Sequence, residues 1–503
     1  MPADAAAAEI LAPGTPFVTA IRRFAELRPD EVVLIDHEGS LTRRELELRS
    51  NRLARAYAGL GVAEGDFVSI ALPNGIPFVV SMLATWKLGA TPQPLSHRLP
   101  ARELTAIIGV SGSALVVGLD AGDAAPSVPI GFEPDPSLSD EPLPVVVSPS
   151  WKAPTSGGST GTPKIIVSTG PAVIDVLIPL MPLLKMPQGG VKLTSTPLAH
   201  NIGVMFTTAP LITGGTIVIA PRFDPENTLR LIEEHRVDWT TMVPTMLHRI
   251  AKLPPEVRER ADLSSIVAIA TGGAMCPQWL KEFWVEWVGG PRMVEFYSST
   301  ESQAIVIADG DDWMAHPGTV GRVVIGELEV RDDGGAVLGD DEVGELWMRR
   351  GAGAAPAYLY RGATAKSDLE GWETVGDLGW THEGWVFLAD RTADMAVIGG
   401  SNVYPAEVEG ALEEHPLVLS SCVFGIPDDE YGNVLYAVVQ TSGEVSDDEL
   451  VAHLRERLLP YKVPRTFERS STPIRDDAGK VRRAMLRQQT IESRATIGAG
   501  SVS

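Results

Sequence analysis

The order of strand and helix patterns along about the first 150 residues restricts the folds that this chain can adopt. Thr42-Arg43-Arg44-Glu45 is a capping box, which predicts the start of a helix. The apolar, β-branched run Phe67–Leu72 predicts a short strand, and a second helix is expected over about residues 77–88, ending before Gly89. Strand, helix and strand in succession predict a parallel sheet with helical crossovers. The fold class is therefore expected to be α/β.

The later part of the chain shows different patterns. Apolar strands are expected at residues 215–220 and 263–270, and short alternating segments separated by Gly and Asp predict antiparallel strands over residues 326–349. The pattern changes again beyond Asp390, where we expect a second unit. Residues 120–144 are rich in Asp, Pro, Ala and Ser, and such a composition buries little apolar surface, so this segment is expected to be an exposed excursion.

The charge of the chain narrows the classes of partner. Its 42 basic and 65 acidic residues give a formal net charge of −23, which disfavours binding to nucleic acid and to anionic membranes. Any anionic substrate must therefore meet cations that are placed locally. With 503 residues, the chain is expected to form two or three structural domains.

The cysteines and the apolar segments predict a cytoplasmic protein. Cys276 and Cys422 are far apart and lack metal-ligand spacing, so neither a disulfide scaffold nor a zinc site is expected. The N-terminal residues 1–13 contain no basic run and do not resemble a signal peptide. The longest apolar stretch, Phe78–Trp86, is too short to span a bilayer.

A glycine- and hydroxyl-rich segment is the strongest local motif. It reads Thr155-Ser156-Gly157-Gly158-Ser159-Thr160-Gly161-Thr162-Pro163-Lys164. Small residues between glycines let the backbone wrap around phosphate oxygens, and Lys164 supplies positive charge. It is not a Walker A loop, because no Gly-Lys-Ser/Thr follows at the required spacing. A flexible surface loop is the alternative interpretation of this segment alone.

Several later segments are weak signals when taken singly. Glu295-Phe296-Tyr297-Ser298-Ser299-Thr300-Glu301 ends in a carboxylate, which is useful beside a phosphate loop only if a cation such as magnesium lies between them. Gly376-Asp377-Leu378-Gly379 could close a turn, Asp390–Asp394 could be a solvated charge cluster, and Gly479-Lys480 could be a hairpin turn. The order in which they occur is more informative.

In this order the motifs resemble the adenylate-forming superfamily of acyl-CoA synthetases, non-ribosomal adenylation domains and luciferases, over nearly the whole chain. The other motifs that carry the resemblance are Pro197–His200 with Gly203, Thr271–Ala274, Gly344–Leu346, Gly399–Glu409 and Gly479–Val481. The resemblance implies a large α/β body of several sheets in αβαβα layers with a β-barrel-like subdomain at residues 1–390. It also implies a small, mobile α+β cap at residues 391–503.

The resemblance further implies roles for individual residues around ATP. Gly273, Ala274 and Tyr297 would sandwich the adenine, and Glu295 would meet its exocyclic amine. Asp377 would hold the ribose hydroxyls beside Arg391. Thr160 and Glu301 would act at the phosphates and magnesium, and Lys480 would be the catalytic lysine of the cap. The full implied nucleotide set is Ser156, Gly157, Gly158, Ser159, Thr160, Gly161, Thr162, Lys164, Gly273, Ala274, Glu295, Phe296, Tyr297, Ser298, Ser299, Thr300, Asp377, Arg391 and Lys480.

The remaining implied positions concern the acid and coenzyme A. His200 would act where the acyl pocket meets the α-phosphate, and pantetheine would pass Gly399 and Gly400. The implied acyl-pocket residues are His200, Asn201, Gly203, Val204, Thr245 and Gly272.

The activity implied by the resemblance is ATP-dependent ligation of a carboxylic acid to coenzyme A through an acyl-adenylate, with magnesium as cofactor. No protein nucleophile is needed, in agreement with the absence of a serine or cysteine triad signature. In the family the cap rotates about a hinge just after Arg391. The chain departs from the common pattern at Ala393, where the hinge usually has Asp or Lys, at Asp390, where Gly is usual, and at Ile165, where Gly is commoner.

Three alternatives stand beside this hypothesis. An amino-acid-activating domain would need an acidic residue near the start of the acyl pocket, and residues 201–205 are neutral. Transfer to the phosphopantetheine of a carrier protein stays open, because it presents the same thiol arm. A sensor without turnover is disfavoured by Lys480, Glu301 and Asp377 together. The loop form and the chain length resemble those of synthetases for bile-acid, steroid or terpenoid acids, or for fatty acids.

Overall fold

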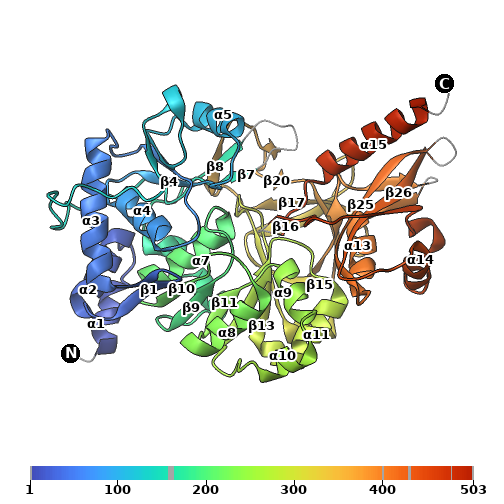
Figure 1. The fold of residues 1–503 in the computed structure, drawn as a ribbon, viewed down its shortest axis with the longest axis horizontal. Helices are drawn as coiled ribbons and strands as arrows, with labels where there is room; N and C mark the ends of the chain where they lie inside the picture. Colours follow the sequence, from blue (N-terminus) through green and yellow to red (C-terminus); the bar gives the residue numbers. More distant parts are fainter. Residues whose placement is uncertain (1–2, 157–163, 399–400, 429–431, 477–478, 501–503) are drawn as a thin grey trace.

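The computed structural model describes residues 3–156, 164–398, 401–428, 432–476 and 479–500. Figure 1 shows the N-terminal body beside a smaller C-terminal part that ends in a projecting helix. Some predicted site residues lie outside the described residues: Gly157, Gly158, Ser159, Thr160, Gly161, Thr162, Gly399 and Gly400.

A long mixed sheet runs through the centre of the body. Six of its strands are parallel, in the spatial order β1, β10, β9, β11, β12 and β13, and β2 pairs antiparallel with β1 at one edge. Their bounds are β1 Val32–Asp36, β2 Gly39–Thr42, β9 Val191–Thr194, β10 Thr216–Ile219, β11 Trp239–Thr241, β12 Ala268–Gly272 and β13 Met293–Tyr297. This arrangement confirms the prediction of a parallel α/β fold.

A second parallel sheet has the order β4, β3, β5, β6. Its strands are β3 Phe67–Ile70, β4 Thr91–Pro94, β5 Leu115–Gly118 and β6 Ser127–Pro129. The strand predicted at Phe67–Leu72 is thus confirmed. Residues 120–144 were expected to be an exposed excursion, and most of them are exposed or half-buried, but β6 within them pairs with β5 and buries Val128.

The helices of the body lie against these sheets (Figure 1). Thr42 caps α3 as predicted: its side chain accepts from Glu45 N at 3.2 Å, and Thr42 N donates to Glu45 Oε2 at 2.8 Å. The helices are α1 Ala3–Ile10, α2 Phe17–Leu27, α3 Arg43–Gly59, α4 Ile76–Lys87, α5 Ala101–Ser111, α6 Leu180–Leu183, α7 Asn201–Ile212, α8 Pro225–His235, α9 Pro244–Ala251, α10 Pro255–Arg260, α11 Gln278–Val288 and α12 Gly310–Ala315. None of the described helices is long and apolar enough to cross a membrane.

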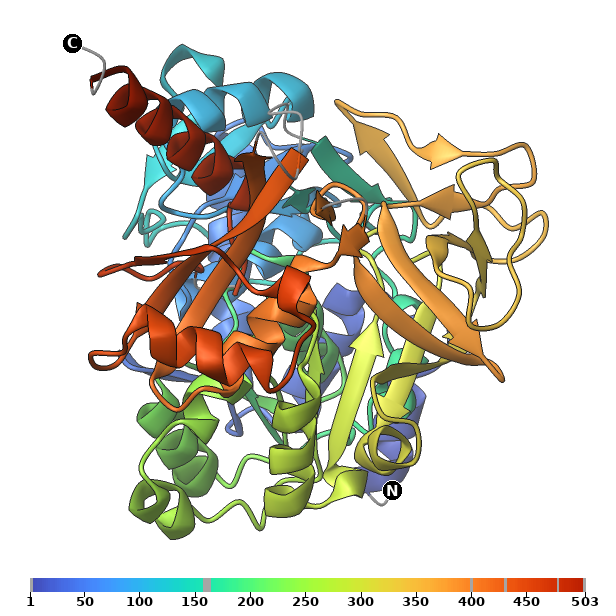
Figure 2. The same ribbon diagram turned by 90° about the vertical axis from the view of Figure 1, so that its right-hand side faces the viewer.

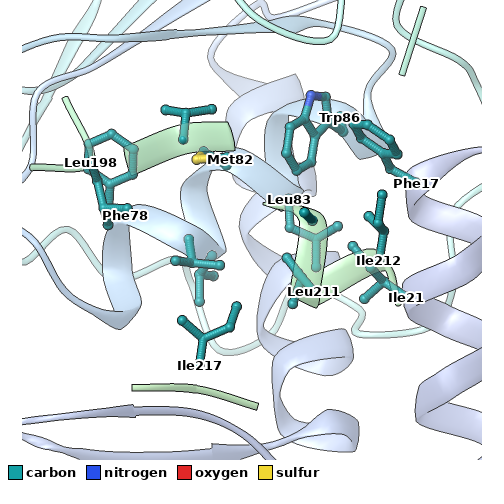
Figure 3. Packing of buried hydrophobic residues seen from close by; sticks show 14 of the residues in the cluster. Phe17, Ile21, Phe78, Met82, Leu83, Trp86, Leu198, Leu211, Ile212 and Ile217 are labelled. Atoms are coloured by element: carbon teal, nitrogen blue, oxygen red, sulfur yellow. The ribbon is translucent and has the colours of Figure 1, made fainter. Parts of the chain in front are cut away.

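The main core joins α2, α4 and α7 (Figure 3). Phe17 and Trp86 pack edge to face, with ring centroids 5.2 Å apart. Trp86 Nε1 donates to the carbonyl of Trp151 at 2.9 Å, and the Trp151 ring lies 6.1 Å from Phe17. The core therefore fixes the segment that immediately precedes the predicted phosphate loop.

Antiparallel strands extend the central sheet beyond β13. They are β14 Ile305–Asp309, β15 Thr319–Ile325, β16 Glu327–Arg331, β17 Gly344–Arg349, β19 Lys366–Ser367, β20 Glu373–Thr374, β21 Asp377–His382 and β22 Trp385–Arg391. A separate antiparallel sheet contains β7 Thr155–Ser156, β8 Lys164–Ser168 and β18 Tyr358–Arg361. The antiparallel prediction for residues 326–349 is confirmed. These antiparallel strands lie in the part of the body where the β-barrel-like subdomain was expected, and β14 and β15 join them to the central sheet.

The C-terminal part is small and mixed, and Figure 2 shows it in front of the body. Its elements are β23 Ala396–Ile398, β24 Ser401–Val403, α13 Pro405–Glu414, β25 Val418–Asp428, β26 Gly432–Thr441, α14 Asp447–Arg455, β27 Thr466–Arg469 and α15 Arg483–Gly500. They enclose their own apolar core, which includes Val408, Leu412 and Leu450.

The strand that was predicted at residues 263–270 begins later in the structure. Residues 263–266 form a turn, in which Ile266 N donates to Leu263 O at 3.1 Å, so β12 begins only at Ala268.

Candidate active site

A large cleft lies at the carboxyl ends of the parallel strands, between the body and the C-terminal part. Its volume is about 2620 Å³. The residues that follow β9, β11, β12 and β13 line it, among them His200, Thr245, Gly273 and Glu301. In open α/β sheets, ligands bind outside the carboxyl ends of the strands, where the connections diverge. The cleft is therefore the candidate active site.

Tyr297, Asp377 and Arg391 form one connected group on the wall of the cleft. Tyr297 Oη donates to Asp377 Oδ2 at 2.9 Å, and Arg391 Nε donates to Asp377 Oδ1 at 3.1 Å. Burial, reinforced by Asp377, raises the pKa of Tyr297, so its hydroxyl stays a hydrogen-bond donor. Each carboxylate oxygen retains a free lone-pair site that could accept a ribose hydroxyl. The predicted sugar-binding residues are thus brought together.

Gly273 and Ala274 line the cleft directly after β12. Gly273 has a φ of +83°, and a Cβ there would lie 3.0 Å from Ile202 Cδ1. The positive φ favours glycine at this position, whereas the Ile202 methyl could shift to admit a Cβ. Such a shelf of exposed backbone suits a flat ring.

Glu295 lines the cleft, but its carboxylate has protein partners. Glu295 Oε2 accepts from Lys281 Nζ at 2.6 Å and from Trp313 Nε1 at 3.0 Å. Lys281 also donates to Thr319 O at 2.7 Å, so this buried ion pair ties α11 and α12 to β13 and β15. The structure gives Glu295 a supporting role in the wall, and its expected contact with adenine stays a prediction.

Lys164 and Glu301 meet at the phosphate side of the cleft. Lys164 Nζ lies 3.3 Å from Glu301 Oε1 and 3.2 Å from Tyr360 Oη, and Tyr360 also donates to Glu301. Glu301 is only 5% exposed, yet it lines the cleft. Ser298, Ser299 and Thr300 also line the cleft, and the buried hydroxyl of Ser299 has no hydrogen-bond partner among the described residues.

Tyr360 was missed by the sequence analysis. It lies on β18, which pairs with β8, the strand that begins at Lys164. The Lys164 ammonium lies 4.7 Å from the centroid of the Tyr360 ring, so the ring and the hydroxyl both orient the predicted phosphate cation. No local motif marks this tyrosine, because its role depends on a strand pairing across almost 200 residues.

The donor set at Glu301 fits magnesium bound mainly through a nucleotide. No group of three or more His, Cys, Asp or Glu that could hold a metal occurs in the described ranges. Mg²⁺ in nucleotide enzymes is commonly held by one or two carboxylates, with phosphates and water completing the shell. A single buried carboxylate beside a phosphate-side lysine satisfies this pattern. The other predicted ligand, Thr160, lies outside the described residues.

Lys480 reaches the cleft from the C-terminal part. Gly479 N donates to Asp476 O at 2.9 Å, and Lys480 N donates to Asp476 Oδ1 at 2.9 Å. Gly479 has a φ of +75°, and a Cβ there would lie 2.5 Å from Thr245 Oγ1 in α9, so glycine permits this close docking. The Lys480 side chain is open to the cleft, whose walls, together with Arg391, lower its pKa.

The C-terminal end of α13 docks on α9 of the body. His248 Nε2 lies 3.3 Å from Glu413 O, and Lys252 Nζ donates to His415 O at 3.2 Å. Carbonyls at the end of a helix have no partner within it. α9 therefore satisfies the end of α13 and helps to hold Lys480 in the cleft.

This docking predicts a pH-dependent stability. Burial, with a contribution from Lys252, lowers the pKa of His248 to about 4, whereas an unfolded histidine titrates near about 6.5. Between these values the unfolded chain binds more protons, so the free energy of unfolding is expected to fall as pH decreases from about 6.5 to about 4. Urea unfolding near pH 7.5 and pH 5 tests this: the wild type is expected to lose more stability than His248→Gln. Equal losses would contradict the assignment.

On the acyl side, three predicted residues line the cleft. His200 is the N-cap of α7, Asn201 is the first residue of this helix, and Thr245 lies in the first turn of α9. Asn201 Oδ1 accepts a hydrogen bond from Lys152, a buried lysine that the sequence analysis did not single out.

The other three predicted acyl-pocket residues do not line the cleft. A Cβ on Gly203 would lie 2.2 Å from Pro197 O, and one on Gly272 would lie 2.5 Å from Phe296 O. Val204 is 1% exposed and belongs to the main core. These residues pack α7 and β12 against their neighbours, and their assignment to the acid stays a prediction.

Three features together define an adenylate-forming enzyme. They are the layered α/β body, the cleft at the carboxyl ends of its strands, and the lysine that the small C-terminal part supplies. Comparison with protein families agrees with this class. The model described as AMP-binding enzyme matches residues 21–359, and the model of the AMP-binding enzyme C-terminal domain matches residues 407–473. The chain belongs to this family of AMP-binding enzymes.

Several of its relatives are named as acyl-CoA ligases or synthases. A feruloyl-CoA synthase of Amycolatopsis sp is 31% identical, over 93% of this chain and 97% of the relative. A long-chain-fatty-acid–CoA ligase of Mycobacterium tuberculosis is 28% identical, over 89% of this chain and 93% of the relative. A Rhodococcus jostii ligase for a methyl-dioxo-octahydroindenyl propanoate is 28% identical, over 93% of this chain and 97% of the relative.

Among solved structures, the o-succinylbenzoate CoA synthetase of Bacillus subtilis in complex with its acyl-adenylate superposes with a TM-score of 0.80. The two sequences are 26% identical, and the match covers 94% of this chain and 98% of the synthetase. The chain is therefore an AMP-forming ligase of the acyl-CoA synthetase class, which acts through an acyl-adenylate.

Proposed function

We propose that this ligase activates a bulky apolar acid, of a polycyclic (bile-acid, steroid or terpenoid-like) or fatty-acid type, and transfers it to free coenzyme A. The observations that carry the proposal are the volume of the cleft, about 2620 Å³, and its apolar lining. Apolar side chains on its walls include Val176, Leu180, Leu184, Ile202, Met205 and Phe296. The relatives that act on a long-chain fatty acid and on a fused-ring propanoate support this substrate class.

The first step brings the carboxylate of the acid to the α-phosphate of ATP, and the two anions repel each other. We propose that Tyr297 and Asp377 fix the nucleoside while Lys164 and Lys480 supply positive charge to the phosphate oxygens. Magnesium, when bound at Glu301, would add charge to the same oxygens. Preorganised charge in a site shielded from water is commonly the largest catalytic contribution. The product is a mixed anhydride with AMP as its leaving group.

The second step is attack of a thiol on the acyl carbonyl. The two cysteines of the chain do not suit this role, because burial raises the pKa of Cys422 to about 12 and raises that of Cys276 further. We propose that the thiol comes from coenzyme A along Gly399 and Gly400, which lie outside the described residues. The phosphopantetheine of a carrier protein would present the same group.

Release of diphosphate from ATP tests the proposal. The purified protein with ATP, magnesium and a panel of acids is expected to liberate diphosphate with polycyclic or long-chain acids, and to form the acyl thioester only when coenzyme A is added. Mass spectrometry of the acyl-AMP formed from a mixed acid library would identify the preferred acid. Turnover restricted to short acids such as acetate would overturn the substrate class, and thioester formation only with a carrier protein would overturn the choice of acceptor.

A further inference from the structure

Four lysines are buried in the described part of the chain, and one of them differs from the rest. Lys87 lies 2.9 Å from Glu47, Lys192 lies 2.7 Å from Asp238, and Lys281 lies 2.6 Å from Glu295. Each of these three ammonium groups is paired with a carboxylate, as a buried charge requires. Lys152 is only 5% exposed, and no described carboxylate lies within ion-pair distance of it.

The surroundings of Lys152 leave its hydrogen-bonding capacity incomplete. Its ammonium has three donors, and the described residues supply one acceptor, Asn201 Oδ1. The face of the Trp151 ring lies beside it, with the centroid 4.4 Å from Nζ. Burial lowers the pKa of Lys152 to about 7, with only the field of Glu301 opposing it. The described residues alone therefore stabilise this cation poorly.

The backbone holds Lys152 rigidly at the edge of the cleft. Lys152 O accepts from Ser168 N at 3.1 Å, and the next residue, Ala153, donates to Pro92 O at 3.1 Å. The preceding Trp151 is anchored in the main core through Trp86. Lys152 and Asn201 both line the cleft, so this incompletely bonded lysine belongs to the wall of the site. A fixed, buried cation on a cleft wall is suited to an anionic ligand.

We propose that Lys152, oriented by Asn201, binds the reacting carboxylate of the acid substrate before adenylation. This inference rests on the proposed function. Asn201 follows His200 at the N-terminus of α7, and Glu301 of the phosphate side is close enough to influence the Lys152 ammonium. These neighbours place Lys152 at the end of the acyl site that faces the phosphates, where the carboxylate must arrive. The substrate carboxylate would supply the anionic partner that Lys152 lacks among the described residues.

The interaction is expected to act on acid binding. Once the acyl-adenylate forms, the former carboxylate no longer carries a negative charge, so Lys152 contributes little to the thiol step. Lys152→Met and Lys152→Gln are expected to raise the KM for the acid about 10- to 100-fold, the range of a lost hydrogen bond to a charged group. The KM for ATP, and thioester formation from presynthesised acyl-AMP, are expected to change less than about threefold.

The experiment measures KM and kcat for acids with and without a second oxygen-containing group, in the wild type, in both Lys152 variants and in Lys192→Met. Lys192 is an equally buried lysine that does not line the cleft, so this variant reports general destabilisation. An increase in KM for every acid, seen in the Lys152 variants alone, supports the proposal. An increase limited to acids with a second oxygen group, or an unchanged KM in both variants, would overturn it. Neither result would affect the proposed ligase activity, which wild-type diphosphate release tests separately.

Discussion

Lys480→Ala is expected to lower the rate of acyl-adenylate formation by about 10²–10³-fold, the usual effect of losing one preorganised charged donor. Thioester formation from presynthesised acyl-AMP is expected to stay within a few-fold of the wild type. The reason is that Lys480 enters the cleft beside Arg391, on the side of the nucleotide. The two half-reactions can be measured separately, as diphosphate release and as thioester formation.

A control lysine from the same part of the chain is available. Lys462 pairs with Glu407 at 2.6 Å and does not line the cleft, so Lys462→Ala is expected to leave both half-reactions unchanged. An equal loss of both half-reactions in Lys480→Ala would contradict the division of labour between them. In that case the contact of Gly479 with Thr245 would maintain a site structure that both half-reactions need.

Local rules were sufficient for much of the fold. The capping box at Thr42 and the β-branched run at Phe67 depend on neighbours within a few residues, and both predictions were confirmed. The strand expected at 263–270 was misplaced because an apolar run can be buried in a turn as well as in a strand.

The candidate site was predicted less evenly. Motif order alone brought Tyr297, Asp377, Arg391 and Lys480 to one cleft, but it gave no information about which face of α7 would be buried. The structure shows that Gly203 packs against Pro197, and its place at the substrate stays a prediction.

The residues that were missed depend on distant partners. Lys152 meets Asn201 across 49 residues, and Tyr360 meets Glu301 across 59 residues. Nothing in the sequence distinguishes Lys152 from the other lysines. Only the structure shows that it is buried without a carboxylate partner among the described residues. Such pairs are set by tertiary packing, which no local pattern encodes.

Glu301→Gln is expected to lower kcat/KM for adenylation by about 10²-fold and to raise the Mg²⁺ concentration needed for half-maximal rate. Glutamine retains the shape of the side chain but loses the charge that would hold the ion, and it leaves Lys164 without its carboxylate partner. Initial rates of diphosphate release across a Mg²⁺ titration, at saturating ATP and acid, measure both effects.

A neighbouring carboxylate provides the matched control for this variant. Tyr358 precedes Tyr360 by two residues on β18 and donates to Glu373 Oε2 at 2.7 Å, much as Tyr360 donates to Glu301. Glu373 does not line the cleft, so Glu373→Gln removes a similar tyrosine–carboxylate pair without approaching the phosphates. An unchanged Mg²⁺ requirement in Glu301→Gln, or the same shift in both variants, would show that Glu301 supports the sheet and does not hold the ion. A shift in Glu301→Gln alone would assign the metal side of the site to this carboxylate.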